Sequence, residues 1–157
     1  MSVVRTARLQ LRAVDEQDVP AIVDGCSDPE VARFIPVVPH PYSQDDARRW
    51  LAGASDRSTA ARELSLALTR LDRNELLGVV TVRLRAGGSI GYWLRPCARG
   101  HGLMAEAVSV VAGWATREHR VHGLFITAHV ERRLVSACAG VFAPLTAGMG
   151  LAGFTRS

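Results

Sequence analysis

The sequence predicts an α/β protein built on a mixed sheet, in which an antiparallel meander is followed by a helix and a parallel strand. Three observations support this fold class. Residues 63–69 and 76–84 alternate or are rich in valine, and residues 89–94 form a third run of this kind, as expected for consecutive strands. A long helical pattern at 103–119 comes next, and a further strand pattern at 121–130 follows it.

The part of the chain before the meander predicts one strand and three helices. Residues 8–14 alternate polar and apolar side chains, which is typical of a half-buried strand. Asp15 is placed to cap a first helix, and residues 28–34 indicate a second, short one. After a proline-rich loop at 36–41, Ser43 is expected to cap a third helix that opens with acidic residues.

The turns between the later elements fit the same order. Residues 72–74 are expected to join the first two meander strands, and residues 87–88 to lead into the third. The helix at 103–119 is the longest predicted, because its alanines and valines fall on one face. In the strand pattern that follows, Leu124 and Ile126 alternate with Phe125.

Size and composition set limits on the function. A chain of 157 residues suits one domain with one core, so we expect a single domain over residues 1–157. Hydrophobic residues at 48% and charged residues at 22% are ordinary for a folded soluble protein. All 19 basic residues are arginine, which suits phosphorylated ligands but also follows from a GC-rich genome. They are scattered and the net charge is +4, so we expect no nucleic-acid partner.

The cysteines and the apolar segments bear on location. Cys26, Cys97 and Cys138 are widely spaced and form neither a metal-binding pattern nor a disulfide framework. We therefore expect reduced thiols, no bound metal and a cytoplasmic protein. No apolar run approaches 18 residues, so we expect no membrane partner.

A glycine-rich turn separates the strand at 89–94 from the long helix. Residues 99–102 read Arg-Gly-His-Gly. Exposed N–H groups at a helix start, beside glycines that allow close approach, form an anion site for phosphate. A pair of glycines alone more often forms only a tight turn, so the context has to decide.

That context resembles the GNAT superfamily of acyl-CoA-dependent N-acetyltransferases. The family signature Q/R-x-x-G-x-G/A is matched at residues 97–102, directly after Ile-Gly-Tyr-Trp-Leu-Arg-Pro at 90–96. Together with Thr-Ala-Arg-Leu-Gln-Leu-Arg at 6–12, these motifs are similar to the branch of bacterial enzymes that acetylate ribosomal-protein N-termini. The resemblance is strong over residues 6–131.

The resemblance implies a cofactor, a reaction and a set of binding residues. It implies a sheet splayed at its centre, with acetyl-CoA as cosubstrate and a primary amine as acceptor, either a peptide N-terminus or a small molecule. A main-chain N–H of the third meander strand would stabilise the oxyanion. The residues implied to bind the cofactor are Tyr92, Trp93, Leu94, Arg99, Gly100, His101, Gly102 and Leu103.

The catalytic groups are less well defined by the resemblance. Glu131, at the end of the last predicted strand, is a candidate base, with a plain surface charge as the alternative. Ser136 is a candidate acid, although it is shifted by one position from the family's Asn-x-x-Ser. Glu106 more often has a structural role in the family, and Ser89 stands where this branch often carries an acidic residue. No residue is assigned as the base.

Several side chains near the signature have two interpretations. Tyr92 and Trp93 either contact the acyl group or belong to the core, and His101 either donates to phosphate or faces solvent. Cys97 replaces the family's glutamine or arginine, which removes one polar contact with the cofactor. A nucleophilic Cys97 would need His101 as its activating base.

Residues 132–157 depart from the family pattern. The 24 residues from Leu134 to Ser157 hold one charge and are too few for the helix and two strands that complete the family's sheet. One hypothesis is a frame shift or truncation near codon 132, and the other is a native tail that pairs with a second subunit in a homodimer. The missing asparagine of Asn-x-x-Ser and the missing last strands favour an alternative function, a catalytically impaired acyl-CoA-binding or interaction protein on a GNAT core.

Overall fold

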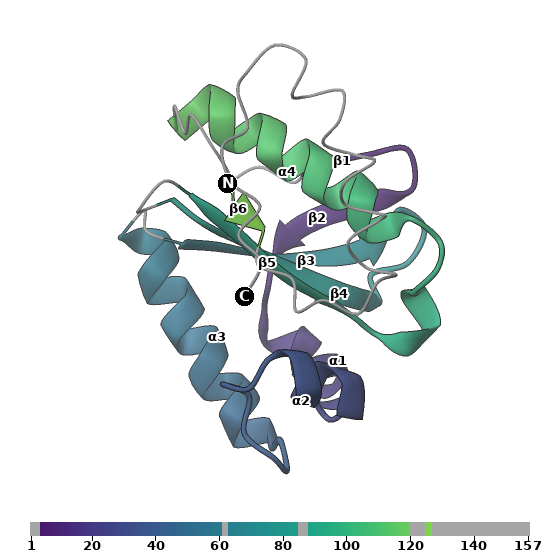
Figure 1. The fold of residues 1–157 in the computed structure, drawn as a ribbon, viewed down its shortest axis with the longest axis vertical. Coiled ribbons are helices and arrows are strands. Elements are labelled where there is room, and N and C mark those ends of the chain that lie inside the picture. The colour runs from purple at the N-terminus through teal and green to yellow at the C-terminus, as the bar shows by residue number, and fades with distance from the viewer. Residues whose placement is uncertain (1–3, 61–62, 85–87, 120–124, 127–157) are drawn as a thin grey trace.

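The computed structural model describes residues 4–60, 63–84, 88–119 and 125–126 (Figure 1). Within these ranges six strands form one sheet in the order β1-β2-β3-β4-β5-β6. Neighbouring strands are antiparallel from β1 to β5, and β6 runs parallel to β5, so the predicted mixed sheet is confirmed. The strands are β1 Val4–Arg5, β2 Leu9–Ala13, β3 Glu63–Arg70, β4 Leu76–Arg83, β5 Ser89–Leu94 and β6 Phe125–Ile126.

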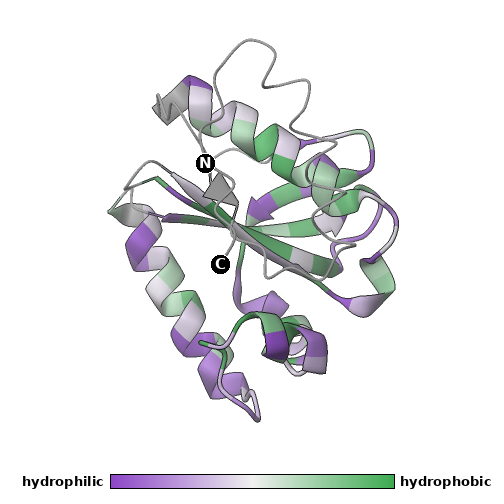
Figure 2. Ribbon diagram, in the orientation of Figure 1, coloured by the Kyte–Doolittle hydropathy of each residue, from purple (hydrophilic) through white to green (hydrophobic). Residues whose placement is uncertain are grey.

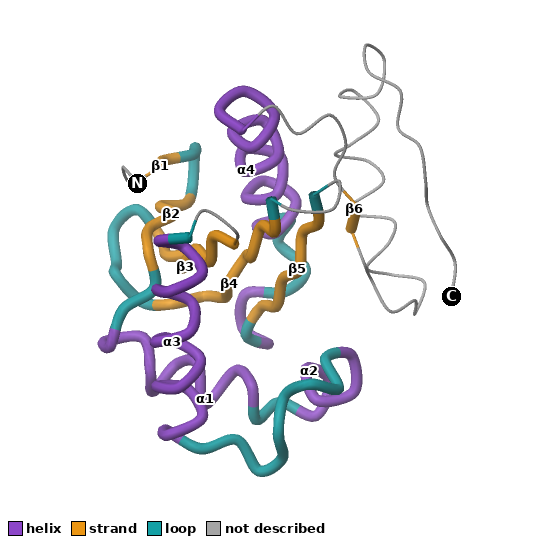
Figure 3. The backbone as a smooth tube through the Cα atoms, turned by 90° about the vertical axis from the view of Figure 1, so that its left-hand side faces the viewer, coloured by secondary structure: helices purple, strands orange, loops and turns teal. Residues whose placement is uncertain are grey.

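Helices cover both faces of the sheet. The helices are α1 Val19–Cys26, α2 Pro29–Phe34, α3 Gln44–Thr59 and α4 Leu103–His119, with short 3-10 turns η1 Glu16–Asp18 and η2 Pro96–Ala98. Figure 1 shows α1, α2 and α3 on one side and α4 on the other, and the turned view in Figure 3 agrees. No helix in the part of the chain that the structure describes is long and apolar enough to cross a membrane.

Two apolar cores lie on the two faces of the sheet. Alternate residues of β4 enter opposite cores, because Val80 packs on the α4 side whereas Val79 packs on the side of α1 and α3. In Figure 2 the central strands are mostly hydrophobic, while α3 is largely hydrophilic. The candidate site lies where β4 and β5 meet the core formed with α1 and α3.

The helix caps follow the sequence closely. Ser43 Oγ accepts from the N–H of Asp46 at 3.1 Å, and the Asp46 carboxylate accepts from the N–H of Ser43 at 2.9 Å, which closes the predicted cap of α3. Asp28 caps α2 by accepting from the N–H of Glu30 at 3.1 Å. The first helix differs from the prediction, since Asp15 caps the turn η1 and α1 itself begins at Val19.

A buried ion pair fixes η1 to the sheet. Both terminal nitrogens of Arg12 on β2 donate to the carboxylate of Asp18 at 2.8 Å, and Asp18 is 2% exposed. The same carboxylate accepts from the N–H of Asp15 at 3.0 Å. Arg12 thus joins the first long strand to the helices that follow it.

The structure differs from the sequence prediction at the start of the sheet, and at its end it describes only part of the predicted strand. Strand β1 was not predicted, because a strand of two residues has no alternation to detect; it pairs with β2 around Thr6, whose hydroxyl accepts from the N–H of Leu9 at 2.9 Å. Of the strand predicted at 121–130, residues 125–126 form β6. The tail at 132–157, with its predicted incomplete strands, lies outside the described residues.

Candidate active site

The turn between β5 and α4 presents backbone N–H groups at a helix start. Gly100 and Gly102 have φ of +80° and +71°, a left-handed conformation that glycine adopts without strain. The N–H of Glu106 donates to the carbonyl of Gly102 at 3.1 Å. In an α-helix the N–H groups before this first bond have no acceptor within the helix, so the start of α4 offers donors to an anion.

The turn also leaves space beside these donors. A Cβ atom added at Gly100 would meet nothing within 4 Å, and one added at Gly102 would meet only the Nη2 atom of Arg8 at 3.8 Å. A phosphate group can therefore approach the main chain at Gly100 closely. The residues present thus fit a pyrophosphate-bearing cofactor.

Arg8 and Glu106 hold the turn in place. Arg8 Nε donates to one oxygen of Glu106 at 2.7 Å, and the N–H of Arg8 donates to the other at 3.1 Å. Arg8 Nη1 also donates to the carbonyl of His101 at 2.9 Å. Burial raises the pKa of Glu106, but hydrogen bonds from Thr6 and Arg8 outweigh it and leave the pKa below its usual value. Glu106 therefore acts as an anchor for the turn.

Arg99 connects the turn to α2. Its guanidinium donates to the carbonyl of Leu94 through Nε at 3.1 Å and Nη2 at 2.9 Å, and forms ion pairs with Asp28 and Glu30. Its own N–H donates to the carbonyl of Pro96 at 3.2 Å. The side chain of Arg99 thus points to α2, and its predicted contact with the cofactor stays a prediction.

The two edges of β5 have different main-chain groups. The N–H of Arg95 donates to the carbonyl of Leu77 at 2.9 Å, just beyond the last paired residues of β4 and β5. Hydrogen-bonded and non-bonded pairs alternate in antiparallel strands, so Trp93 bonds to β4. The main chains of Tyr92 and Leu94 face the opposite edge, at which β6 pairs. Of the three predicted residues, Tyr92 and Leu94 therefore have main-chain groups that face a ligand placed at that edge, whereas the main chain of Trp93 bonds to β4.

The side chains of β5 alternate between the two faces. Tyr92 and Leu94 pack against the core under α4, whereas Trp93 packs against the core formed with α1 and α3. Tyr92 and Trp93 also line a cavity. Both residues therefore take part in core packing, and their contact with the acyl group stays a prediction.

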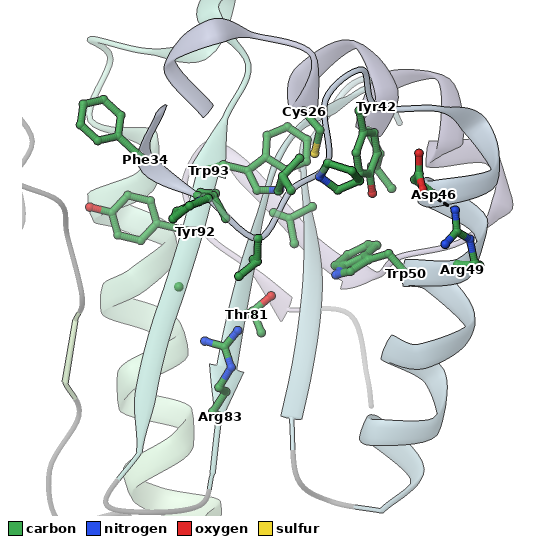
Figure 4. Close-up of a pocket in the computed structure, with 18 of the residues that line it drawn as sticks. Cys26, Phe34, Tyr42, Asp46, Arg49, Trp50, Thr81, Arg83, Tyr92 and Trp93 are labelled. Atoms are coloured by element: carbon green, nitrogen blue, oxygen red, sulfur yellow. Dashed lines mark hydrogen bonds and ion pairs between the residues drawn. The ribbon is translucent and has the colours of Figure 1, made fainter. Parts of the chain in front are cut away.

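This cavity has a volume of about 520 Å³ and lies between the sheet and α1, α2 and α3 (Figure 4). The proline-rich loop at 36–41 forms one wall and β4 and β5 form the floor. Its aromatic lining consists of Phe34, Tyr42, Trp50, Tyr92 and Trp93, and its charged lining of Asp46, Arg49 and Arg83. A volume of this size is typical of small-molecule sites.

Sequence reasoning missed most of the residues on the α3 side of this cavity. Tyr42 precedes the cap of α3, and Trp50 lies one helical turn after the buried Ala47. The spacing of Ala47, Trp50 and Ala54 marks the face of α3 that packs on the sheet, which was the available signal. Nothing in the sequence indicated that Arg83 would enter the cavity.

Three titratable groups that line the cavity keep their usual protonation states near neutral pH: Cys26 and Tyr42 are protonated and Asp46 is ionised. Burial raises the pKa of the Cys26 thiol to about 12 and is the largest cause that raises the pKa of Tyr42 to about 12. Hydrogen bonds from Ser43 hold the pKa of Asp46 below its usual value. None of these three groups is a strong proton acceptor near neutral pH.

The structure gathers most of the predicted residues around one strand. Tyr92, Trp93 and Leu94 lie on β5, and residues 99–103 form the turn and the first residue of α4. His101 and Cys97 are exposed, and Cys97 is a free thiol. The candidate base Glu131 and the candidate acid Ser136 lie outside the described residues.

Comparison with known proteins decides the family. Residues 8–134 match the model of the acetyltransferase (GNAT) domain. The chain belongs to the GNAT acetyltransferase family. The match contains the glycine turn, the cavity and α4, so the features described above form part of a GNAT domain. No curated protein matches the chain significantly.

Solved GNAT structures share the fold at low sequence identity. One is RimL, a ribosomal L7/L12 alpha-N-protein acetyltransferase in complex with coenzyme A, at 21% identity and a TM-score of 0.77 over 88% of this chain and 81% of that one. Another is the ribosomal-protein-S5-alanine acetyltransferase from Vibrio fischeri, at 19% identity and a TM-score of 0.75 over 92% and 82%. The acetyltransferase from Agrobacterium tumefaciens str. C58 has 20% identity and a TM-score of 0.75 over 91% and 83%.

Proposed function

We propose that this GNAT chain is an N-acetyltransferase that uses acetyl-CoA and acetylates a peptide N-terminal α-amine. One observation carries the proposal: the glycine turn and the cavity adjoin the same strand, β5. A cofactor held at the turn and an amine held in the cavity would therefore meet beside Tyr92. The similarity in fold to RimL, solved with coenzyme A, supports this choice of cofactor.

The turn and β5 would bind and orient the cofactor. Acetyl-CoA supplies the acyl group in activated form, as a thioester. The N–H groups of Gly100, His101, Gly102 and Leu103 would bind its pyrophosphate. The N–H of Tyr92 or Leu94 would donate to the acetyl oxygen, where negative charge develops as the amine attacks.

The cavity would orient the amine and exclude water. The amine nitrogen would bond to the acetyl carbon as the carbon–sulfur bond breaks; the nitrogen would lose a proton and the CoA thiolate would leave and be protonated. A peptide α-amine has a pKa of roughly 7.7–8.0, against about 10.4 for lysine, so part of it is already neutral near pH 7.5. Because the cavity residues described above include no strong base, an α-amine is the better acceptor.

Two residues outside the described ranges complete the proposal. Glu131 is proposed as the base that receives the amine proton, and Ser136 as the acid that protonates the departing thiolate. We also propose a cytoplasmic location, because a newly synthesised peptide chain would present its N-terminal α-amine there. A homodimer that completes the sheet also stays a proposal, and a strictly monomeric protein in solution would exclude it.

A second candidate function is an acyl-CoA-binding or interaction protein without catalysis. The sequence after Glu131 favours it, because Arg132 stands where the family branch has asparagine. Binding of acetyl-CoA without transfer to any amine would identify this function.

Calorimetric titration with acetyl-CoA, with desulfo-CoA as control ligand, tests the cofactor site. We expect micromolar binding that is lost in Gly100→Glu, since the new carboxylate fills the open space and repels phosphate. Gly100→Ala is the matched control, because it introduces the backbone strain without charge or bulk, and we expect it to retain most of the affinity. Equal binding by the wild type and Gly100→Glu would refute the site. Transfer to peptide N-termini is then followed by mass spectrometry.

A further inference from the structure

We propose that the acceptor carries, next to its α-amine, a large apolar side chain that fills the cavity and a carboxylate that binds Arg83. This inference rests on the proposed function and deepens it by naming the class of acceptor. The apolar part follows from the lining of the cavity, and the carboxylate follows from the charges at its edge.

Apolar and aromatic groups dominate the lining. Trp93 rises from the floor on β5, and Tyr42 and Trp50 approach it from the α3 side (Figure 4). Ile22 and Val79, which are 1% exposed each, also line the cavity. Rings and aliphatic groups of this kind favour an apolar side chain in the same space.

The charged residues of the lining leave one positive charge in excess. Asp46 forms an ion pair with Arg49, and this pair is neutral overall. Arg83 shares the carboxylate of Glu63 with Arg57, at distances of 2.9 Å and 2.8 Å from the two Nε atoms. Two guanidinium groups on one carboxylate carry a net charge of +1, and only Arg83 of this trio lines the cavity. An anionic group on the ligand complements this charge.

The geometry of Arg83 suits a carboxylate. Its Nε atom binds Glu63, so the terminal nitrogens extend toward the cavity, in the direction of Thr81 (Figure 4). A Cβ atom added at Gly91 would lie 3.4 Å from Nη1 of Arg83, so the guanidinium lies over a residue without a side chain. This position is one residue before Tyr92, where the amine would react. A guanidinium edge binds a carboxylate with two parallel hydrogen bonds.

Two sources can supply this carboxylate, and four ligands distinguish them. Phe-Asp-amide carries it on the second residue, free phenylalanine carries it on the amino acid itself, and Phe-Asn-amide and phenylalanine amide lack it. Ala-Asp-amide tests the apolar side chain. Binding of each to the protein saturated with desulfo-CoA is measured by calorimetry, and transfer from acetyl-CoA is measured separately by mass spectrometry.

We expect the ligand with a carboxylate to bind about tenfold more tightly than its matched amide, as a charge-assisted hydrogen bond provides. Arg83→Gln should abolish this preference, and Arg83→Lys should retain part of it. Arg5→Gln, on β1 at the far edge of the sheet, is the matched control with the same loss of charge, and it should behave as the wild type. Circular dichroism checks that each variant is folded.

The outcomes separate this inference from the proposed function. Equal binding of acidic and neutral ligands by the wild type, or a preference that survives in Arg83→Gln, overturns the inference even if peptides are acetylated. An Arg83-dependent preference without any transfer supports a binding site for an acidic, apolar amine and refutes the enzyme. If only free phenylalanine shows the preference, the inference holds and the peptide acceptor is wrong.

Discussion

The indole ring of Trp93 lies directly against the backbone of Gly25. A Cβ atom added at Gly25 would be 2.2 Å from Cζ3 of that ring, closer than two carbon atoms can approach. This contact determines how near α1 comes to β5, and it therefore fixes one wall of the cavity. The absence of a side chain at position 25 is what allows the ring to lie there.

Replacing Gly25 by alanine should destabilise the protein by about 1–3 kcal/mol, because the methyl group forces the ring or the helix to move. Urea unfolding followed by tryptophan fluorescence measures both the stability and the environment of Trp93. Gly113→Ala in α4 is the control: its methyl group meets only the flexible end of Arg117 at 3.2 Å, so a helix-favouring alanine should be neutral or stabilising. Unchanged stability in Gly25→Ala would contradict the contact.

Arg8→Met should weaken the cofactor site more than the fold. Half of the Arg8 side chain is exposed, at 51%, so we expect at most about 1 kcal/mol from its ion pair with Glu106. Losing the bond to the His101 carbonyl frees the glycine turn, and the KM for acetyl-CoA should rise about fivefold with little change in kcat. Arg5→Met provides the comparison on the neighbouring strand. A fall in kcat alone would argue against a positioning role.

The carboxylate of Glu106 predicts a dependence of stability on pH. Its pKa is lower in the folded protein than in the unfolded chain, because Thr6 and Arg8 donate to the ionised form. Its contribution is therefore complete above the unfolded pKa of about 4.3 and is lost as the pH falls through the lower, folded pKa. Glu106→Gln should be less stable than the wild type at pH 7, and the difference should shrink below pH 4. Urea midpoints over this range test it, and a constant difference would show that ionisation is irrelevant.

Thiol alkylation should distinguish two cysteines. Cys97 is exposed, whereas Cys26 is buried and its pKa is raised to about 12, so of these two described cysteines only Cys97 should react with iodoacetamide at pH 8 in the folded protein. Peptide mapping by mass spectrometry identifies each site, and reaction in urea should include Cys26. Acetyl-CoA should slow the reaction of Cys97, which lies in the turn η2 just before the glycine turn. Rapid labelling of Cys26 without denaturant would show that α1 opens readily.

The pair of Arg12 and Asp18 should be the most sensitive ion pair for stability. Their side chains are 11% and 2% exposed, so Arg12→Met leaves a buried carboxylate without its partner and should cost about 3–5 kcal/mol. Removing both charges, in Arg12→Met with Asp18→Leu, should recover much of that loss. Thermal unfolding compares the three proteins. If the double variant were no better than the single one, the buried charge would not be the cause.

Local patterns predicted the strand, the glycine turn and the helix of the candidate site well. The glycines at 100 and 102, the strand before them and the amphipathic α4 are contiguous in the chain, so spacing alone indicates a strand, a turn and a helix. Ser43 likewise capped α3 as expected. These features depend on neighbours within a few residues.

The cavity depends on contacts between distant segments, which the sequence alone does not reveal. Arg83 enters the cavity because the register of β4 and β5 places it opposite Ser89, and because Gly91 leaves room. Trp50 faces the same space only once α3 has packed on the sheet. The partner of Arg99 at Asp28 is 71 residues away in the chain.

The bridge from Arg99 to α2 also has an energetic consequence. The guanidinium of Arg99 donates to the carbonyl of Leu94 at the end of β5, next to the glycine turn, and forms an ion pair with Asp28 at the start of α2. Helix α2 ends at Phe34, which lines the cavity. Because linkage is reciprocal, whatever change in affinity a ligand at the turn causes for a ligand in the cavity, the second ligand must cause equally for the first.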